Sequence, residues 1–410
     1  MTTSRGPALL ILTSAFLAAA ANGISMVAFP WLVLQRTGSA TDASVVAGAA
    51  TLPLLLATLI SGSAVDLLGR RRVAMLADAM SAVSLAAIPI LAHTVGADAL
   101  NIVVLSALAA FGAFFDPAGL TARRSMLPEA AQRAGWSIDQ TNSLYEAGFN
   151  LGYLTGPGIG GVLIATVGGV NTMWVTAAAF GCSILTMAVL RLEGADQPDP
   201  EQRPESVLTG VMEGLRFVWN NRVLRTLGLI DLALIGLYLP MESVLFPKYF
   251  SDRNEPAQLG WVLMALSIGG LVGALSWSVL SRVVSRRATV LTAVLTYGVA
   301  ILVIAMLPPL PVILVLAAVI GLVYGPIGPI YNSVMLTLTP ESLRGRVVGV
   351  MTSMAYASGP VGFMLAGPLI DAFGLRVAFV ALAAPILVVA LVCPWLPALR
   401  ELDGAPATGS

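Results

Sequence analysis

The feature that most constrains this chain is a series of twelve apolar runs, each long enough to cross a lipid bilayer. A helix needs about 20 predominantly apolar residues to span the hydrocarbon core. Because lipid offers no hydrogen-bond partner to the backbone, each run is expected to be helical. The runs lie near residues 8–34, 43–65, 73–95, 99–120, 138–166, 171–190, 223–248, 258–281, 288–307, 311–337, 347–371 and 376–398.

Composition excludes a water-soluble fold. Of the 410 residues, 57% are hydrophobic and 11% are charged, whereas soluble domains carry about 25% charged residues. The net charge is zero, which gives no indication of a nucleic-acid partner. The first run is too long for the apolar region of a signal peptide, so we expect an uncleaved first span. We therefore predict an all-α membrane protein that lies in the lipid bilayer as a monomer and binds no nucleic acid.

The distribution of basic residues predicts the orientation, because cytoplasmic loops are enriched in arginine and lysine. With a cytoplasmic N-terminus, 18 of the 22 basic residues fall on the inner side. The four that fall outside are Arg36, Lys248, Arg253 and Arg376. This bias predicts a multi-pass protein of the inner (cytoplasmic) membrane with both termini in the cytoplasm.

One long polar segment, residues 192–221, separates the first six runs from the last six. We interpret it as a cytoplasmic linker between an N-terminal half, residues 1–191, and a C-terminal half, residues 222–410. Gly156-Pro157 in the fifth run corresponds to Gly367-Pro368 in the eleventh, 211 residues later. Parallel six-helix halves of this kind place a substrate site between them, near the membrane midplane.

The loop between the second and third runs has a distinctive spacing, Gly62-x-x-x-Asp66-x-x-Gly69-Arg70-Arg71. Gly69 permits a sharp turn, and Arg70 lies four residues after Asp66, within reach of an ion pair on a helix. Ordinary positive-inside charge would explain the arginines, but it would not explain the two glycines and the aspartate at these positions.

This loop resembles the signature loop of the major facilitator superfamily, and the resemblance implies the twelve-helix fold of that family. There the loop is a cytoplasmic latch that stabilises the outward-open state, with Asp116 as the partner expected for Arg70. The glycines of the fifth run are similar to the helix motif of the family's antiporters. The implied latch residues are Gly62, Asp66, Gly69, Arg70, Arg71, Asp78 and Asp116, and the antiporter motif comprises Gly148, Gly152, Gly156, Pro157, Gly160 and Gly161.

Residues 115–161 look most like the drug and siderophore exporters, a branch that includes macrolide efflux proteins. The chain departs from many drug:proton antiporters in one respect. Residues 105–113, in the fourth run, contain no arginine, which makes a proton relay through that helix doubtful.

The fifth run has two opposite faces. Its glycines recur every four residues and form a stripe suited to close helix contact. Glu146 lies two residues before Gly148, and at 100° per residue this places it on the other side of the helix. We expect this second face to line the cavity, although Glu146 could instead be a hydrogen-bonded packing residue.

The seventh run carries Asp231, Tyr238, Glu242 and Tyr249 at helical spacing. Acids facing lipid would be costly, so this face is expected to line the cavity. Asp231 could instead pack within the bundle, and Glu242 could lie at the membrane interface. Neighbouring aromatic and methionine side chains suit apolar cargo, although such stripes are often plain packing. The predicted cavity residues are Asn22, Asn150, Tyr153, Tyr238, Tyr324, Tyr331, Met354 and Tyr356.

These patterns favour transport over catalysis. The single histidine, His93, and two separated cysteines give no metal site, and the chain has no phosphate-binding loop for ATP. We expect no cofactor and no enzyme activity. Glu146, Asp231 and Glu242 are the predicted proton-coupling residues of a proton-driven exporter of amphipathic small molecules. The alternatives are a dedicated exporter of one siderophore, natural product or lipid, a non-transporting receptor, and an intramembrane enzyme.

Overall fold

A computed structural model describes residues 4–192, 207–340 and 343–403, and within these ranges the chain is helical with no β-strand. It divides into two compact units, which are described separately. Unit 1 comprises Met1–Gly38, Val45–Glu205 and Phe250–Gly260. Unit 2 comprises Ser39–Ser44, Ser206–Tyr249 and Trp261–Ser410. The predicted division into two six-helix halves with a linker at residues 192–221 stays a prediction.

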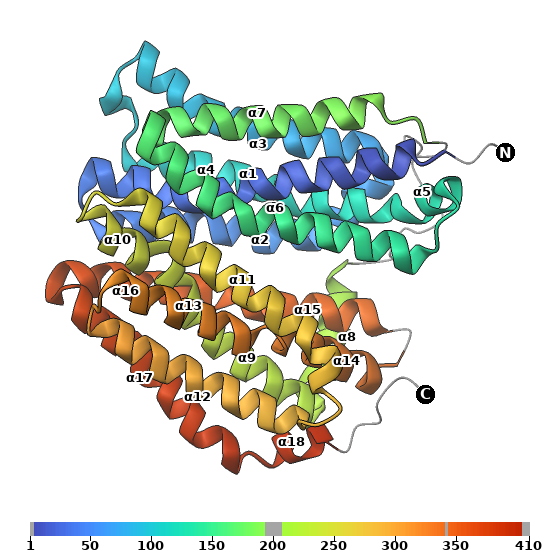
Figure 1. Ribbon diagram of the computed structural model, residues 1–410. Coiled ribbons are helices and arrows are strands. Elements are labelled where there is room, and N and C mark those ends of the chain that lie inside the picture. Colours follow the sequence, from blue (N-terminus) through green and yellow to red (C-terminus); the bar gives the residue numbers. More distant parts are fainter. Residues whose placement is uncertain (1–3, 193–206, 341–342, 404–410) are drawn as a thin grey trace. The chain divides into compact units, whose positions relative to one another are not determined.

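Unit 1 is built around its first helix. Helix α1 packs against α6 and α7, and α3 packs against α4 and α7, so these helices run side by side in Figure 1. Eight alanines and glycines of α1 are buried, and such small residues let neighbouring helices approach closely. The helices are α1 (Gly6–Thr37), α2 (Ala40–Leu68, whose first turn belongs to unit 2), α3 (Arg70–Thr94), η1 (Ala97–Ala99), α4 (Ile102–Ser125), α5 (Leu127–Ala134), α6 (Ile138–Val167) and α7 (Gly169–Val189).

Unit 2 has α9 and α12 at the centre of its contacts. Helix α9 packs against α15 and α16, and α12 packs against α13 and α17. The elements are α8 (Val207–Asn220), α9 (Arg222–Pro240), η3 (Met241–Leu245), α10 (Phe246–Ser251), α11 (Pro256–Leu280), α12 (Arg286–Ala305), α13 (Leu310–Tyr324), α14 (Ile327–Leu338), α15 (Arg344–Ala357), α16 (Gly359–Phe373), α17 (Leu375–Val392), η5 (Cys393–Trp395), α18 (Pro397–Arg400) and η6 (Glu401–Asp403).

Among the described residues, eleven helical segments are long and apolar enough to cross a membrane. Helix α6 is not among them, although its 30 residues are sufficient in length. It is the helix that carries Asp139, Glu146 and two asparagines, and these polar residues lower its mean hydropathy. With α6 included, the helices correspond to the twelve predicted runs, so the fold prediction is confirmed.

Two predicted runs are interrupted where proline prevents a continuous helix. The tenth run is divided into α13 and α14 around Gly325 and Pro326, and the eleventh is divided into α15 and α16 around Ser358. Proline lacks the N–H that a continuing helix requires. The seventh run also changes its winding, because η3 is a π-helical turn that follows Pro240.

Four helices begin directly after a side chain that caps their first turn. The side chains of Asn101, Ser137, Asn221 and Ser285 each accept a hydrogen bond from a backbone N–H in the first turn of α4, α6, α9 and α12 respectively. Such caps satisfy donors that have no partner within the helix. Gly69 precedes α3 with φ of 88°, a conformation that glycine adopts readily.

Part of the predicted linker is a helix. Helix α8 packs against α15, so closely that a Cβ at Gly214 would lie 2.9 Å from the carbonyl oxygen of Arg346. The Arg346 guanidinium also pairs with the Glu213 carboxylate. The sequence prediction treated this stretch as a polar connection because its charged residues obscured its apolar face.

Candidate functional site

The glycine face of α6 lies directly against α1. A Cβ at Gly156 would lie 2.6 Å from the Cα of Gly23, and one at Gly152 would lie 2.4 Å from the carbonyl oxygen of Phe16. A Cβ at Gly160 would lie 3.2 Å from the Cα of Ile24, and one at Gly148 would lie 3.9 Å from the carbonyl oxygen of Leu12. Pro157 is buried in the same interface, where its Cδ lies near Gly23. A side chain on this face would therefore force the two helices apart.

At its last turns, α6 also approaches the beginning of α11, which belongs to unit 1 up to Gly260. A Cβ at Gly161 would lie 2.6 Å from the carbonyl oxygen of Pro256. The antiporter motif of the sequence analysis thus serves two close helix contacts within unit 1.

Glu146 lies on the opposite, exposed face of α6. Its Oε1 accepts a hydrogen bond from Nη2 of Arg124 at 2.8 Å, and the two side chains are 48% and 49% exposed. Arg124 lies in the last turn of α4, and its guanidinium also lies over the Tyr145 ring, 5.9 Å from the centroid. This cationic neighbour of Glu146 was not predicted from the sequence.

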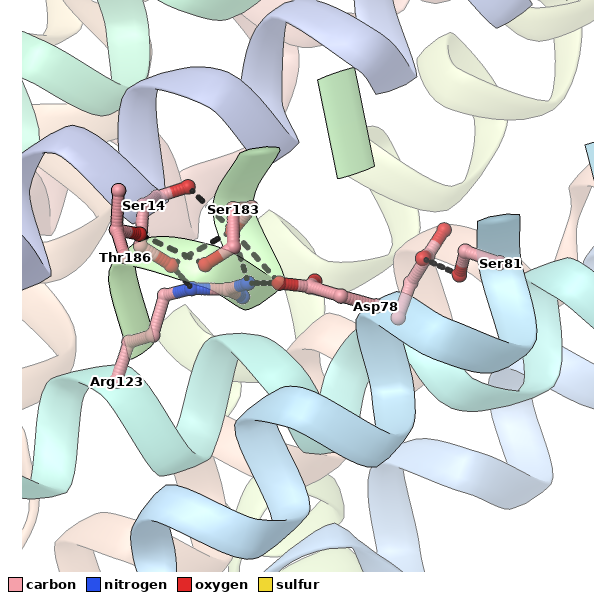
Figure 2. A network of polar contacts seen from close by, with 7 residues as sticks. Ser14, Asp78, Ser81, Arg123, Ser183 and Thr186 are labelled. Carbon is pink, nitrogen blue, oxygen red and sulfur yellow. Dashed lines mark hydrogen bonds and ion pairs between the residues drawn. The ribbon is translucent and has the colours of Figure 1, made fainter. Parts of the chain in front are cut away.

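A buried polar network joins four helices of unit 1 (Figure 2). The Arg123 guanidinium of α4 pairs with the Asp78 carboxylate of α3, and these residues are 4% and 2% exposed. Arg123 Nε donates to Ser14 Oγ of α1 at 2.8 Å, and Ser183 Oγ of α7 donates to Asp78 Oδ2 at 2.6 Å. One buried ion pair therefore ties together α1, α3, α4 and α7.

Arg123 was assigned from the sequence to the cytoplasmic surface, whereas the structure buries it inside unit 1. The neighbouring acid, Asp116 of α4, accepts a hydrogen bond from Ser81 Oγ of α3 at 3.0 Å (Figure 2 shows Ser81). Asp78 and Asp116 thus belong to the interior of the helix bundle. Their role in the latch stays a prediction.

Arg70 and Arg71 hold the start of α3 against other inner helix ends. Arg70 Nη1 pairs with Glu129 Oε1 at 2.5 Å and donates to the carbonyl oxygen of Ser125 at 2.9 Å. Arg71 donates to the last carbonyls of α7, at Met187 and Ala188. The expected partner Asp116 is engaged with Ser81. The surroundings of Gly62 and the side chain of Asp66 are outside the part of the chain that the structure describes.

The remaining cavity candidates of unit 1 lie on α1 and α6. Asn150 and Tyr153 are exposed on α6, and Asn22 is half-buried on α1. The Tyr153 hydroxyl donates to the Met26 sulfur at 3.4 Å. Asn150 lies two residues from both Gly148 and Gly152, which places it on the side of α6 turned away from the glycine contact.

In unit 2, Asp231 of α9 lies among tyrosines. The Tyr324 hydroxyl of α13 donates to Asp231 Oδ1 at 3.3 Å, and the Tyr331 hydroxyl of α14 donates to the carbonyl oxygen of Leu227 at 3.4 Å. The structure therefore brings together three of the predicted residues from three helices. Within the described chain, no arginine or lysine pairs with Asp231.

Glu242 is the more deeply buried acid, with 8% exposure. It lies in the π-helical turn η3 and accepts a hydrogen bond from the Tyr238 hydroxyl one turn earlier. No basic residue of the described ranges pairs with it. The π-turn changes the winding after Pro240. The residues from Asp231 to Tyr249 that were predicted to share one helical face can therefore share it only before this turn.

Methionines cover the inner part of α9. A Cβ at Gly228 would lie 3.2 Å from the sulfur of Met351 and 3.2 Å from the terminal methyl of Met354, both on α15. Met354 thus lies one turn from Asp231 along α9. The side chain of the remaining candidate, Tyr356, lies outside the described residues. Residues able to form a metal centre do not cluster anywhere in the described chain.

Sequence reasoning missed three residues that the structure makes prominent. Arg123 was hidden among basic residues at a helix end. Tyr297 of α12 is fully buried beside Tyr238 and Tyr324, and a single tyrosine in an apolar run gives no periodic signal. Asp371 ends α16, where its carboxylate accepts hydrogen bonds from the backbone N–H groups of Ala40 at 3.0 Å and Thr41 at 2.9 Å. Asp371 lies three residues after the Gly367-Pro368 pair that the sequence analysis singled out, and this was the signal that could have identified it.

Comparison with known proteins identifies the family. The sequence profile described as Major Facilitator Superfamily matches residues 11–254 and 243–409. The chain belongs to this superfamily. It is therefore a multi-pass membrane transporter of small molecules and not an enzyme.

Relatives within the superfamily are exporters by name. The chain is 67% identical over 401 residues to the multidrug efflux pump Tap of Mycolicibacterium fortuitum, with 98% of each chain covered. It is 63% identical over 404 residues to Tap of Mycobacterium tuberculosis, covering 98% of this chain and 96% of that one. The enterobactin exporter EntS of Escherichia coli is 28% identical over 273 residues, 66% of this chain and 63% of EntS.

Solved structures agree on the major facilitator fold. A mutant of the nucleoside transporter NupG superposes with a TM-score of 0.79 at 12% identity, covering 95% of this chain and 99% of that one. A POT family transporter superposes with a TM-score of 0.74 at 11% identity, covering 95% and 96%. At this identity the likeness concerns the fold alone.

Proposed function

We propose that this chain is a proton-coupled exporter of amphipathic small molecules, with cations preferred over anions. The observation that carries the proposal is the pair of carboxyl groups in unit 2, Asp231 and Glu242. Glu242 is buried and Asp231 is half-buried, both are hydrogen-bonded by tyrosine hydroxyls, and neither is paired with a cation in the described chain. An acid inside a membrane protein without a counter-ion is characteristic of ion and proton pathways.

The chemistry of this pair suits exchange between a proton and a cation. Burial penalises the charged form of a carboxyl group, so the group is stabilised either by a proton or by a positively charged ligand. Tyrosine faces add cation–π attraction of about 0.5–2 kcal/mol. Tyr238, Tyr324 and the methionines of α15 supply an adaptable apolar surface around the acids. Proton and cargo therefore compete for the same groups, which is the basic requirement of antiport.

The proton gradient is sufficient as an energy source. Exchange of one proton for one monovalent cation moves no net charge, so the pH difference drives it, at about 1.4 kcal/mol per pH unit. For a neutral cargo, one proton entering down a membrane potential of about 100 mV releases about 2.3 kcal/mol. At about 1.4 kcal/mol for each factor of ten, this supports a cargo gradient of roughly 50-fold.

The relatives support the direction of transport and the breadth of cargo. Two proteins more than 60% identical over nearly the full length are called multidrug efflux pumps. By this proposal the chain works as a monomer in the inner membrane with both termini in the cytoplasm. Its inner loop at residues 62–71 acts as the latch, and Glu146, paired with Arg124, is a third candidate for proton coupling.

The test uses purified protein in proteoliposomes with a lipophilic cation, tetraphenylphosphonium, and its isosteric anion, tetraphenylborate. We expect the cation to bind at least tenfold more tightly than the anion, and its affinity to fall as the pH drops. Asp231→Asn and Glu242→Gln should each abolish uphill export while expression is retained. Asp98→Asn, at an exposed acid of η1, is the matched control and should export normally.

A preference for the anion, or cation binding that does not depend on pH, would contradict the proposal. If neither probe binds, the result favours a dedicated exporter of one compound, the class suggested by the similarity to the enterobactin exporter EntS.

A further inference from the structure

Between the two acids of unit 2 lies a row of three tyrosines from three elements. The Tyr297 ring of α12 is 6.3 Å from the Tyr238 ring of α9 and 6.4 Å from the Tyr324 ring of α13, measured between centroids. Tyr238 is hydrogen-bonded to Glu242 at one end, and Tyr324 is hydrogen-bonded to Asp231 at the other. The row therefore joins one acid to the other, with Tyr297 in the middle.

Tyr297 differs from its neighbours in having a free hydroxyl. The residue is 2% exposed, and its Oη has no hydrogen-bond partner among the described residues. Buried polar groups in folded proteins nearly always have a partner, and the exceptions call for an explanation. A phenol that packs only by its ring could be replaced by phenylalanine, so the retained hydroxyl points to a transient partner.

The charged and titratable groups around Tyr297 are consistent with this role. Glu242 and Tyr324 act on it electrostatically. Beyond them lie Asp231 next to Tyr324, Tyr331 near the same acid, and Cys393 near Tyr331. None of these groups is a cation, so the row offers only hydroxyl, thiol and carboxyl groups.

We propose that Tyr297 is the hydrogen-bonding link through which a proton passes between Glu242 and Asp231. This inference rests on the proposed function and specifies its proton route. In the step, the carboxyl proton of Glu242 moves to the Tyr238 oxygen, the Tyr238 proton moves to the Tyr297 oxygen, and the Tyr297 proton moves to the Tyr324 oxygen. At the same time the Tyr324 proton moves to Asp231 Oδ1. Glu242 ends as the carboxylate, Asp231 ends as the neutral acid, and all three tyrosines remain neutral.

The two acids then have different roles. The proton enters or leaves at one carboxyl, while the cation displaces it from the other. Tyr297 is a proton relay in this scheme, because it takes up one proton as it gives up another and never carries a net charge.

The test is the substitution Tyr297→Phe, which removes the hydroxyl and keeps the ring packing. We expect the maximal rate of proton-driven tetraphenylphosphonium export to fall at least tenfold, with the half-saturating concentration unchanged within about twofold. Exchange of labelled for unlabelled tetraphenylphosphonium, which needs no net proton movement, should stay at the wild-type rate. Thr176→Val, at a fully buried threonine of unit 1, is the control for losing a buried hydroxyl and should leave all three measurements unchanged.

The outcomes separate this link from the proposed function. If wild-type protein releases no proton when tetraphenylphosphonium is added, proton coupling and the link are both overturned. If wild-type protein releases protons and Tyr297→Phe exports at the wild-type rate, only the link is overturned. If Tyr297→Phe loses binding and exchange together, the hydroxyl is a cargo ligand or a packing element, and the link is again overturned.

Discussion

The buried ion pair of unit 1 provides a quantitative prediction about stability. Asp78→Asn keeps the volume of the side chain and removes its charge, which leaves the Arg123 guanidinium at 4% exposure with only neutral partners, among them Ser14 and Ser183. Removing one partner of a buried pair costs about 3–5 kcal/mol, because the remaining charge is uncompensated. We therefore expect Asp78→Asn to destabilise unit 1 by this amount.

The assay is thermal unfolding of the detergent-purified protein. For a unit of this size each kcal/mol corresponds to roughly 2–4 °C in Tm, so we expect Asp78→Asn to lower the Tm by roughly 6–20 °C. The double variant Asp78→Leu with Arg123→Met removes both charges and should recover most of this loss, since apolar replacements of buried pairs are often neutral. Glu213→Gln, which breaks an exposed pair with Arg346, is the control and should change the stability by less than about 1 kcal/mol.

Two results would refute this reasoning. The first is a Tm for Asp78→Asn no lower than that of Glu213→Gln, which would mean that Arg123 reaches solvent. The second is a double variant less stable than Asp78→Asn, which would mean that the ion pair itself, rather than the uncompensated charge, supplies the stability.

Three further predictions concern helix contacts and charges. Gly156→Ala should abolish export and lower the yield of folded protein, because its Cβ would lie 2.6 Å from a backbone carbon of α1; Gly181→Ala, which meets nothing within 4 Å, is the control, and equal yields would contradict the packing. Glu146→Gln should slow proton-driven export, and if Arg124→Gln has no effect on the same rate, the pair has no part in coupling. Asp371→Asn should make single cysteines in the first turn of α2 react faster with thiol reagents, since the carboxylate that caps this turn is lost; unchanged labelling rates would exclude the cap.

Local sequence rules predicted the elements of this chain because the bilayer leaves few alternatives. Every backbone group in lipid must be satisfied within its own helix, so an apolar run of about 20 residues predicts a span without knowledge of its neighbours. Helix α6 was predicted as a span although its polar residues lower its mean hydropathy, and its glycine period indicated one close helix contact. The turn at Gly69 and the helix caps were likewise determined within a few residues.

The partners of the charged side chains could not be predicted in this way. Glu146 and Arg124 are 22 residues apart, Asp78 and Arg123 are 45 apart, and Asp231 and Tyr324 are 93 apart. Sequence spacing specifies the face of a helix on which a residue lies, but not which helix that face meets. Arg123 and Arg124 illustrate this limit, since adjacent residues of one helix point to different surroundings, one buried and one exposed.

What the sequence by itself determined is therefore the set of helices, the membrane as their solvent and the helix face that packs most closely. These follow from periodicity and hydropathy, which are properties of a single segment. Only the tertiary structure decided that Glu146 has a cationic neighbour, that a π-turn redirects the end of the seventh span, and that Tyr297 lies between two acids. Each of these depends on how helices far apart in the chain pack together, or on a local winding change that no apolar pattern records.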